Sequence, residues 1–547
     1  MEIALILNTK KISSDMSNRF GEIYPLDLPF KNTNIKNYLL EQYSTRSSIF
    51  IANESSENHE LDIINHKLYN EVLLSYKKSD SILEVIYQSL SRIINICEGN
   101  FSFVVNFGDT IIDDLPQRTL NDYIIVGKRD KYAPWTSVVK DKNKLIFIDK
   151  ESISADKNEN LVAGVFKFSD AYLLLNIIEK YRNDNNNINH HSFYDIIEKY
   201  NSFIPMSLVN TTNWWDFGHE YEYLETKKIV KARYFNEIDI DTKRGILTKR
   251  SKDVEKFIGE ILWYIKIPNE LQYMIPRIYT YSIDSQAPFV SMEYYPYETL
   301  HNLYIFGRLE LNEWKKIISK LFFVKDEMSI ASPKNIKLSV NDLKSIYIDK
   351  TMARHKKLME NDYFKKFLNE DVIINEIVYP SLNEIIKDLS SKFEQFGILE
   401  NREAKIIHGD YCISNILYDV DSQLIKLIDP RGKFGTYDIY GDELYDIAKI
   451  LHSFDGSYDH IINDDFTITE IEDNGFNYSI NKSELQNQIT NLLIDKISER
   501  YNLDQVRLIE GTLFLSMIPL HADYPERQKI MYGQAMKLLS PYYREGK

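Results

Sequence analysis

The chain has 547 residues, of which 44% are hydrophobic and 27% are charged, as is usual for a globular protein. That length exceeds what one hydrophobic core normally serves, so we expect roughly two to four domains. The formal net charge is −15, which would repel a phosphate backbone, and basic residues form only short clusters. Nucleic acid is therefore not an expected partner.

The cellular compartment is predicted from the cysteines and from the lengths of the apolar runs. Two cysteines, Cys97 and Cys412, cannot build a disulfide framework and favour a reducing compartment. The opening MEIALILNTKK lacks a basic segment before its short apolar run, so it does not predict a signal peptide. No run approaches the roughly 18–20 apolar residues that span a bilayer. We expect a cytoplasmic protein without membrane insertion, and a homo-oligomer remains an open alternative.

The first part of the chain alternates between strand and helix patterns. The predicted elements are a strand at 3–7, a helix at 34–44, a strand within 101–114 that ends at Gly108-Asp109, a strand at 162–168 and a helix at 169–181. The polar run at 183–189 predicts a surface loop. Such alternation indicates an α/β domain with a mostly parallel sheet.

The pattern changes after about residue 222. The predicted elements are two strands joined by a turn (232–241 and 246–251), a helix within 251–268, a strand at 288–295 and mostly helices from about 311 onward. We therefore divide the chain into a first domain at 1–224, a small β-rich lobe at 225–300 and a larger helical lobe at 301–547.

Four polar residues stand out within apolar surroundings near residue 410. His408, Asp410 and Asn415 lie in IIHGDYCISNILYD, and Asp429 follows in IKLIDPRG. The flanking apolar runs predict short strands that hold these side chains at one edge. Phosphoryl transfer needs a carboxylate near the acceptor hydroxyl and oxygen ligands for Mg²⁺. One Asn and two Asp residues supply such groups.

These stretches, HGDYCISNIL and LIDPRG, resemble the aminoglycoside phosphotransferase and choline kinase superfamily. The resemblance implies an α+β protein-kinase-like domain with Asp410 as catalytic base, Asn415 and Asp429 as Mg²⁺ ligands, and a structural His408. The alternative is a surface turn with capping Asp and Asn side chains. The metal motif is IDPRG rather than DFG, and no APE-type segment follows, which favours a small-molecule acceptor over a protein.

The same resemblance implies an ATP site upstream. Lys249 in ILTKRS would hold the α- and β-phosphates, with Glu260 as its ion-pair partner. Glu293 and Tyr294 would contact adenine through their backbone. The alternative is a solvated lysine at a strand edge and a glutamate on the exposed face of a helix. A glycine-rich phosphate loop is absent, as it often is in this superfamily, and Gly245 stands alone between the two strands.

Two more carboxylates follow the motif. Asp442 and Asp446 lie beside the helical run in GTYDIYGDELYDIAKILHS (435–453). We interpret both as helix-capping or surface charges.

In the first domain, FGDT (107–110) and NWWDFGHEYEYLETKK (213–228) resemble the sugar nucleotidyltransferases. That family has a Rossmann-like GT-A fold with a Gly-Asp at a strand end and a later Trp-x-Asp-x-Gly-Thr. The resemblance implies an α/β nucleotidyltransferase-like domain in which Asp109 and Asp216 bind Mg²⁺ together. The metal would neutralise the phosphates of an NTP such as CTP while a sugar-phosphate oxygen attacks the α-phosphorus. Either Asp taken alone is more often a turn residue.

The first loop departs from that family's pattern. A glycine-rich loop ending in Arg, and later a Lys-Pro, should follow the first strand, because backbone N–H groups of such a loop cradle the triphosphate. This chain has LILNTKKISSDMSNRFGEIYPLDLPF instead. Lys10, Lys11 or Arg19 would have to compensate, and Tyr24 stands where the lysine is expected. The domain could bind an activated sugar without making it.

Three functions remain open. The first is an ATP-dependent kinase for a small sugar or amino-alcohol, coupled to NTP-dependent activation of its product. The fused layout resembles bacterial capsule and surface-glycan proteins, which implies polysaccharide precursor synthesis. The second is a kinase with a non-catalytic sugar- or nucleotide-binding module. The third is a non-catalytic scaffold, against which the set of Asp410, Asn415 and Asp429 speaks.

Overall fold

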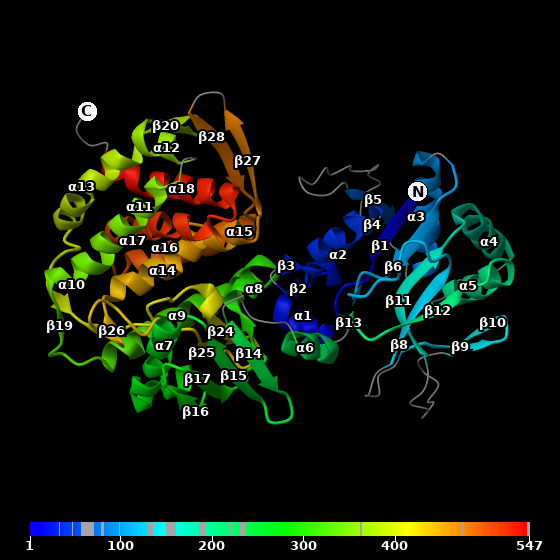
Figure 1. Ribbon diagram of the computed structural model, residues 1–547, viewed down its shortest axis with the longest axis horizontal. Coiled ribbons are helices and arrows are strands. Elements are labelled where there is room, and N and C mark those ends of the chain that lie inside the picture. Colours follow the sequence, from blue (N-terminus) through cyan, green and yellow to red (C-terminus); the bar gives the residue numbers. More distant parts are fainter. Residues whose placement is uncertain are drawn as a thin grey trace. The chain divides into compact units, whose positions relative to one another are not determined.

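The computed structural model divides the chain into two compact units, Met1–Val230 and Lys231–Lys547 (Figure 1). It describes residues 1–31, 33–45, 47–55, 71–77, 81–97, 99–128, 135–148, 160–184, 192–218, 220–229, 236–361, 364–471 and 474–543. The boundary predicted after residue 224 falls inside helix α6 (Glu220–Ile229). Of the loop predicted at 183–189, residues 183 and 184 end helix α4, and the remainder lies outside the described residues.

The N-terminal unit is built on one large sheet, which has nine strands among the described residues. The strands are β1 (Glu2–Asn8), β4 (Ser48–Ser55), β5 (Glu71–Lys77), β6 (Ser102–Asn106), β8 (Tyr123–Gly127), β9 (Ser137–Asp141), β10 (Lys144–Ile148), β11 (Asn160–Phe168) and β12 (Ser207–Thr211). Their order is β10-β9-β11-β6-β1-β4-β5, and β8 pairs with both β11 and β12. Strand β1 is buried and pairs in parallel with β4 and β6, which explains its nearly continuous apolar run.

The sheet is mixed, so the prediction of a mostly parallel sheet was wrong. Strand β11 runs antiparallel to β6, β8 and β9, and β9 and β10 form an antiparallel hairpin. The turn at Lys142-Asn143 is too short for the crossover that a parallel pair requires. Apolar runs mark buried strands but carry no information on strand direction, so the sequence pattern did not reveal this half of the sheet.

Helices enclose the sheet as the alternation predicted. They are α1 (Ser14–Phe20), α2 (Ile35–Ser44), α3 (Ile82–Ile96), α4 (Ala171–Asp184), α5 (Ser192–Phe203) and α6. Helices α3, α4 and α5 share one buried core with Ile3, Leu5 and Leu7 of β1. Because side chains alternate along a strand, Ala4 and Ile6 lie on the other face. Helix α2 packs against β4 (Figure 1).

The C-terminal unit begins with a small lobe. Its antiparallel sheet has the order β14 (Asn236–Asp241), β15 (Ile246–Ser251), β17 (Phe289–Glu293) and β16 (Ile278–Ser282). Helix α7 (Val254–Lys266) follows β15 and buries Phe257, Ile261 and Trp263. It ends just before Pro268, because the residue that precedes a proline disfavours the helical conformation.

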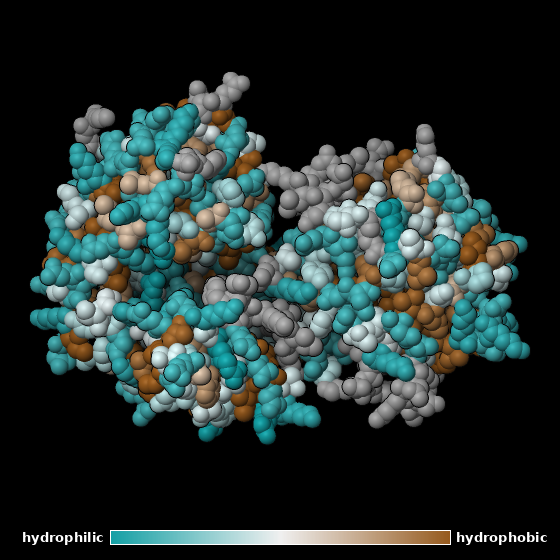
Figure 2. Space-filling model, viewed as in Figure 1, coloured by the Kyte–Doolittle hydropathy of each residue, from teal (hydrophilic) through white to brown (hydrophobic). Residues whose placement is uncertain are grey.

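The rest of this unit is mainly helical. The helices are α8 (Leu300–Ile305), α9 (Leu311–Ile330), α10 (Val340–Lys344), α11 (Lys350–Met359), α12 (Lys365–Asn369), α13 (Leu382–Gln395), α14 (Glu443–Phe454), α15 (Tyr458–Ile462), α16 (Glu484–Ser498), α17 (Leu503–Met517) and α18 (Pro525–Leu539). Helix α14 packs against α16 and α17, and α17 packs against α18. On the face seen in Figure 2, hydrophilic residues cover most of this unit and hydrophobic residues are scattered.

Short strands complete the helical lobe. They are β18 (Glu298–Thr299), β19 (Lys337–Leu338), β20 (Val372–Ile374), β21 (Ile377–Tyr379), β22 (Arg402–Glu403), β23 (Lys405–Ile406), β24 (Ile416–Asp419), β25 (Leu424–Leu427), β26 (Tyr440–Gly441), β27 (Phe466–Ile471) and β28 (Gly475–Ile480). An α/β unit followed by a small β lobe and a larger helical lobe is the fold class predicted from the sequence. In the described part of the chain, no helix combines the length and apolarity needed to span a membrane.

Candidate functional site

Backbone hydrogen bonds hold the His-Gly-Asp loop and the Asp-Pro-Arg-Gly loop together. The Arg431 N–H donates to the His408 carbonyl at 2.9 Å, and the Ile428 N–H donates to the Asn415 carbonyl at 3.0 Å. His408 Nε2 lies 3.0 Å from the Ile428 carbonyl oxygen. Burial lowers the pKa of His408, so its imidazole is neutral and Nε2 is the donor. The two motifs are thus one structural piece, and His408 joins them.

Asp410 lies between Asn415 and a lysine that no motif indicated. Asn415 Nδ2 donates to the Asp410 carbonyl at 3.0 Å and to Asp410 Oδ2 at 3.1 Å. Lys449 Nζ lies 2.9 Å from Asp410 Oδ1. Burial alone would raise the pKa of Asp410, but Lys449 and Arg431 outweigh it and hold that pKa below its ordinary value. Asp410 is therefore a carboxylate whose two oxygens face different groups.

Lys249, Glu260 and Asp429 form an ion-pair triad. Lys249 Nζ lies 2.8 Å from Glu260 Oε1 and 2.7 Å from Asp429 Oδ1. Burial raises the pKa of Glu260 to about 7, and the charge of Asp429 contributes to the same shift, because one lysine cannot neutralise two carboxylates. Lys249 and Glu260 are buried, whereas the Asp429 side chain is 45% exposed. Asp429, the residue of the triad with the exposed carboxylate, is also the one predicted from the sequence to bind Mg²⁺.

Helix α7 and the Asp-Pro-Arg-Gly loop meet at two glycines. Gly432 has a φ of +65°, and a Cβ added there would lie 1.9 Å from the Gly259 carbonyl oxygen. Only a residue without a side chain fits this conformation and this approach. The Asp429 N–H also donates to Tyr264 Oη at 3.0 Å. These contacts fix Asp429 beside α7 and so beside Glu260.

The segment predicted to contact adenine is already paired within the protein. The Glu293 N–H donates to the Arg277 carbonyl, and the Tyr294 N–H donates to the Gly245 carbonyl, both at 2.8 Å. The Glu293 carboxylate accepts from Tyr295 Oη at 2.7 Å. These two backbone donors are therefore directed into the small lobe, and adenine contact by this segment stays a prediction.

The interpretation of Asp442 and Asp446 as surface charges was wrong. They are 2% and 0% exposed. Asp442 does cap α14, accepting from the Leu444 N–H, and it also pairs with Arg402. Asp446 binds the His-Gly-Asp loop and pairs with Lys325 at 2.7 Å. Helix α14 is buried on nearly all sides, so these two carboxylates do not face solvent.

A group of polar residues that no sequence motif indicated lies beside Asp410. Arg431 Nη1 donates to Tyr445 Oη at 2.5 Å, and Lys350 Nζ donates to the same oxygen at 3.1 Å. Tyr445 and Lys449 are four residues apart on α14, so they lie on one face of the helix. Polar residues at helical spacing within an apolar helix were the available signal. Lys350, on α11, had no sequence signal.

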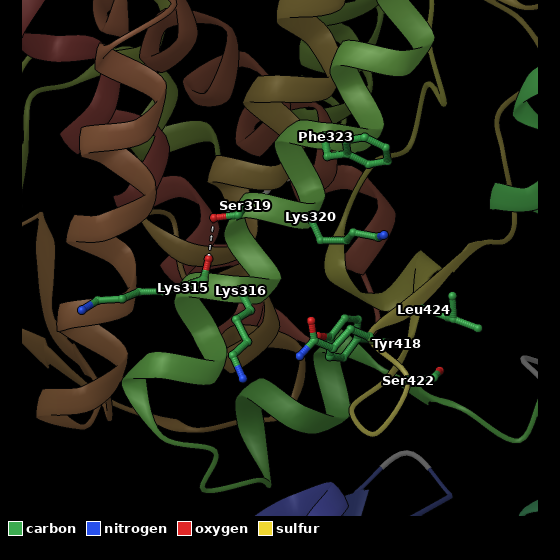
Figure 3. A pocket seen from close by; sticks show the side chains of 9 residues that line it. Lys315, Lys316, Ser319, Lys320, Phe323, Tyr418, Ser422 and Leu424 are labelled. Atoms are coloured by element: carbon green, nitrogen blue, oxygen red, sulfur yellow. Dashed lines mark hydrogen bonds between the residues drawn. The ribbon is translucent and has the colours of Figure 1, made fainter.

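A surface hollow of about 610 Å³ lies at the other end of the β24–β25 hairpin. Its lining comes from α9 and from the hairpin turn (Lys315, Lys316, Ser319, Lys320, Phe323, Tyr418, Ser422, Gln423 and Leu424). Figure 3 shows Lys320 extending toward the hairpin and Lys315 extending away from it. Asn415 and Asp429 flank the opposite end of this hairpin, so the hollow is separate from the candidate site.

In the N-terminal unit, Asp109 and Asp216 come together as the sequence order suggested. Strand β7 (Thr110–Ile112) pairs with β13 (Trp214–Asp216), and the Phe217 N–H donates to the Asp109 carbonyl at 2.8 Å. A Cβ added at Gly218 would lie 3.3 Å from Asp109 Oδ2 and 3.6 Å from Asp216 Oδ1. Burial raises the pKa of Asp109 to about 7, and the charge of Asp216 adds to this. Two adjacent carboxylates of this kind are suited to share a cation.

The three basic residues predicted to replace the missing glycine-rich loop interact with different partners. The positive charge of Lys10 opposes the rise in the pKa of Asp109 but does not cancel it. Arg19 Nε instead pairs with Glu220 Oε1 of α6 at 2.7 Å, and Lys11 pairs with Glu22 at 2.5 Å. Among the residues that the structure describes, no group of three or more His, Cys, Asp or Glu side chains could hold a metal. Within the described residues, a cation at Asp109 and Asp216 would therefore find no third ligand among these side-chain types.

No protein-family model and no curated protein matches the chain. Among solved structures, the CTP:phosphocholine cytidylyltransferase LicC from Streptococcus pneumoniae matches at 11% identity, with 42% of this chain and 99% of that chain covered and a TM-score of 0.32. A GDP complex of an aminoglycoside 2'-phosphotransferase-IIIa mutant matches at 14% identity, over 58% of this chain and 92% of that chain, with a TM-score of 0.37. A streptomycin–ATP complex of APH(2")-IIa matches at 16% identity, over 58% and 94%, with a TM-score of 0.34. At these identities the matches define no activity for this chain.

Proposed function

We propose that the C-terminal unit is an ATP- and Mg²⁺-dependent kinase that phosphorylates an alcohol group of a small molecule. The observation that carries this proposal is the triad in which Lys249 pairs at once with buried Glu260 and exposed Asp429. A lysine held in this way is available to the phosphates of a nucleotide when a cation takes over Asp429. The loop contacts described above place Asp410 and Asn415 in the same structural piece.

The residues present fit a magnesium ion. Asn415 Nδ2 donates twice to Asp410, which turns the amide oxygen Oδ1 the other way. This oxygen and the Asp429 carboxylate are hard oxygen ligands of the type that Mg²⁺ prefers. When bound, the ion neutralises charge on the phosphates of the nucleotide.

We assign to Asp410 the role of orienting the acceptor hydroxyl and receiving its proton. Its carboxylate is ionised, and its side chain is 39% exposed. In the proposed reaction the acceptor oxygen bonds to the γ-phosphorus, the bond from that phosphorus to the leaving ADP oxygen breaks, and the hydroxyl proton passes to Asp410. Positioning by Asn415 and Lys449 keeps both carboxylate oxygens in a fixed orientation.

For the N-terminal unit, we propose NTP-dependent activation of the phosphorylated product, with CTP as one candidate nucleotide. The adjacent Asp109 and Asp216 support this role. The missing glycine-rich loop and the engagement of Arg19 with Glu220 favour a second candidate, a sugar- or nucleotide-binding module without turnover. Synthesis of a surface-polysaccharide precursor in the cytoplasm is the setting that we propose for the two units together.

The test uses the full chain with Mg²⁺, ATP, each other NTP, and a panel of sugars, amino-alcohols and their phosphates. ADP and pyrophosphate are measured separately. Asp410→Asn should lose ADP release by roughly 100-fold or more while it still binds ATP. Supplied with a phosphorylated product, this variant should still release pyrophosphate. Unchanged ADP release by Asp410→Asn would reject the kinase assignment.

The matched variant for the other unit is Asp216→Asn. It should stop pyrophosphate release and leave ADP release at the wild-type rate, since Asp216 belongs to the other compact unit. If the wild-type protein releases ADP but no pyrophosphate with any NTP and phosphate, the binding-module candidate replaces the transferase.

A further inference from the structure

Two cationic side chains bind the hydroxyl of Tyr445, and a third binds Asp410 from the same helix. Arg431 and Lys350 both donate to Tyr445 Oη, and Lys449, four residues along α14, pairs with Asp410 Oδ1. The guanidinium of Arg431 also lies 5.6 Å from the centre of the Tyr445 ring. We call Lys350, Arg431, Tyr445 and Lys449 the cationic cluster.

The cationic cluster carries more positive charge than its neighbours balance. Asp410 pairs directly with one of its three basic side chains, Lys449. Burial alone would raise the pKa of Tyr445, yet Arg431, Lys350 and Lys449 lower it to about 7. Burial and these same cationic neighbours lower the pKa of Lys350 to about 8. A phenol and an amine shifted in these directions both indicate a place that stabilises added negative charge.

Most of the cationic cluster comes from helices α11 and α14, which carry none of the nucleotide residues, whereas Arg431 lies in the same loop as Asp429. Asn415 binds Asp410 Oδ2, whereas Lys449 binds Oδ1, so metal ligand and cluster approach different oxygens of one carboxylate. Lys249 pairs with Asp429 instead, and Glu260 pairs with Lys249. Lys350 follows a single π-helical turn, Ser345–Asp349, a feature often found at functional sites. The cluster therefore lies where an acceptor that presents its hydroxyl to Asp410 would place a second group.

We propose that the acceptor is an alcohol that carries an anionic group, a carboxylate or a phosphate, which Lys350 and Arg431 bind while the hydroxyl faces Asp410. This inference rests on the kinase function proposed above and narrows its substrate class. Arginine and lysine side chains bind carboxylates and phosphates through charge-assisted hydrogen bonds. A purely cationic amino-alcohol would be repelled by the same side chains, so such compounds are excluded as good acceptors.

The competing explanation is that the cationic cluster binds the phosphoryl group during transfer. That explanation predicts that a substitution of Lys350 raises the KM of ATP. The anionic-acceptor proposal predicts that the same substitution raises the KM of the acceptor. Lys350 is the residue to change, because Lys449 and Arg431 also act on Asp410.

The kinetic experiment compares matched acceptors with the full-length protein: glycerol, glycerate and glycerol phosphate, then glucose, glucuronate and glucose 6-phosphate. In each series the anionic compounds should have a higher kcat/KM than the neutral compound. Comparing the carboxylate with the phosphate compound then shows which anionic group is preferred. Lys350→Met should raise the KM of the anionic acceptor by roughly 10- to 100-fold, the usual effect of losing one charge-assisted hydrogen bond. The KM of ATP should change less than about twofold, and Lys350→Arg should restore most of the loss. Preference for the neutral members, or a raised KM for ATP instead, would overturn the proposal.

A binding experiment decides the matter if no acceptor turns over. Tyrosinate absorbance is followed against pH, and the Tyr445→Phe titration is subtracted from that of the wild type. A saturating non-hydrolysable ATP analogue and Mg²⁺ occupy the nucleotide site. Glycerate or phosphate should raise the pKa of Tyr445 and glycerol should not, since an added negative charge opposes ionisation of the phenol. If the pKa of Tyr445 shifts but no assay detects ADP release, the kinase function is rejected and the anion site is retained. If no anion shifts the pKa of Tyr445, the anion site is rejected.

Discussion

The two carboxylate oxygens of Asp446 bind two consecutive N–H groups of the His-Gly-Asp loop. Oδ2 accepts from His408 at 2.8 Å and Oδ1 accepts from Gly409 at 2.9 Å. Lys325 of α9 lies 2.7 Å from Oδ2, and both charged side chains are almost completely buried. Through Asp446, helix α14 therefore fixes the loop that carries Asp410.

Asp446→Ala should destabilise the protein by about 3–5 kcal/mol, because it removes the direct ion-pair partner of the buried Lys325 charge. Unfolding in urea, followed by circular dichroism, measures the change. Asp421→Ala, at an exposed position in the hairpin turn, is the matched control and should change the free energy of unfolding by less than about 0.5 kcal/mol. Lys325→Met combined with Asp446→Leu should recover part of the loss. Equal stabilities of Asp446→Ala and the control would show that the pair does not support the loop.

Asn415→Ala and Asp429→Ala should each raise the Mg²⁺ concentration for half-maximal ADP release by roughly 10-fold or more. Each variant loses one oxygen ligand, and Asp429→Ala also leaves Lys249 paired with Glu260 alone. Asp419→Ala, at the other end of strand β24, is the control and should keep the wild-type requirement. An unchanged Mg²⁺ dependence in both variants would remove these residues from the metal site.

Asp109→Ala and Asp216→Ala should each abolish divalent-dependent NTP binding by the N-terminal unit. The double variant should add little to either single change, because two residues that hold one cation act as a unit and are not additive. Calorimetric titration with an NTP, with and without Mg²⁺, measures the loss. Losses that simply add would mean that the two carboxylates act separately.

Glu510 should make stability fall as pH rises. This residue of α17 is 0% exposed, and burial, with a smaller contribution from the Asp455 charge, raises its pKa well above the ordinary value. Above the ordinary glutamate pKa the unfolded chain releases the proton that the folded protein retains, so the free energy of unfolding decreases with pH. Glu510→Gln stays neutral, and its stability relative to wild type should therefore increase between about pH 5 and pH 8.

Melting temperatures at the two pH values measure the effect. Glu484→Gln, on the exposed side of α16, is the matched control and should show no such difference. A Glu510→Gln variant whose advantage does not grow with pH would mean that Glu510 is ionised in the folded protein.

The sequence predicted the parts of the fold and site that depend on local pattern. The approximate positions of β15 and α7, and thus the proximity of Lys249 and Glu260, followed from a strand and a helix that are neighbours in the chain. The approach of Lys350 to Tyr445 did not, because it joins residues that are 95 positions apart and α11 has no motif. Burial of Asp446 depends on the helices packed around α14. The pattern of a single sequence does not predict which helices pack around α14.

The approach of Gly259 to Gly432 has a mechanical consequence. Since the two backbones touch, a swing of α7 away from the site would have to carry the Asp-Pro-Arg-Gly loop with it. Lys249, Glu260 and Asp429 would then move as one body, and the spacing among them would be preserved. Because the same loop bonds to His408 and Asn415, and Trp263 of α7 donates to the Ile407 carbonyl at 2.8 Å, any movement of α7 would be shared with the His-Gly-Asp loop as well.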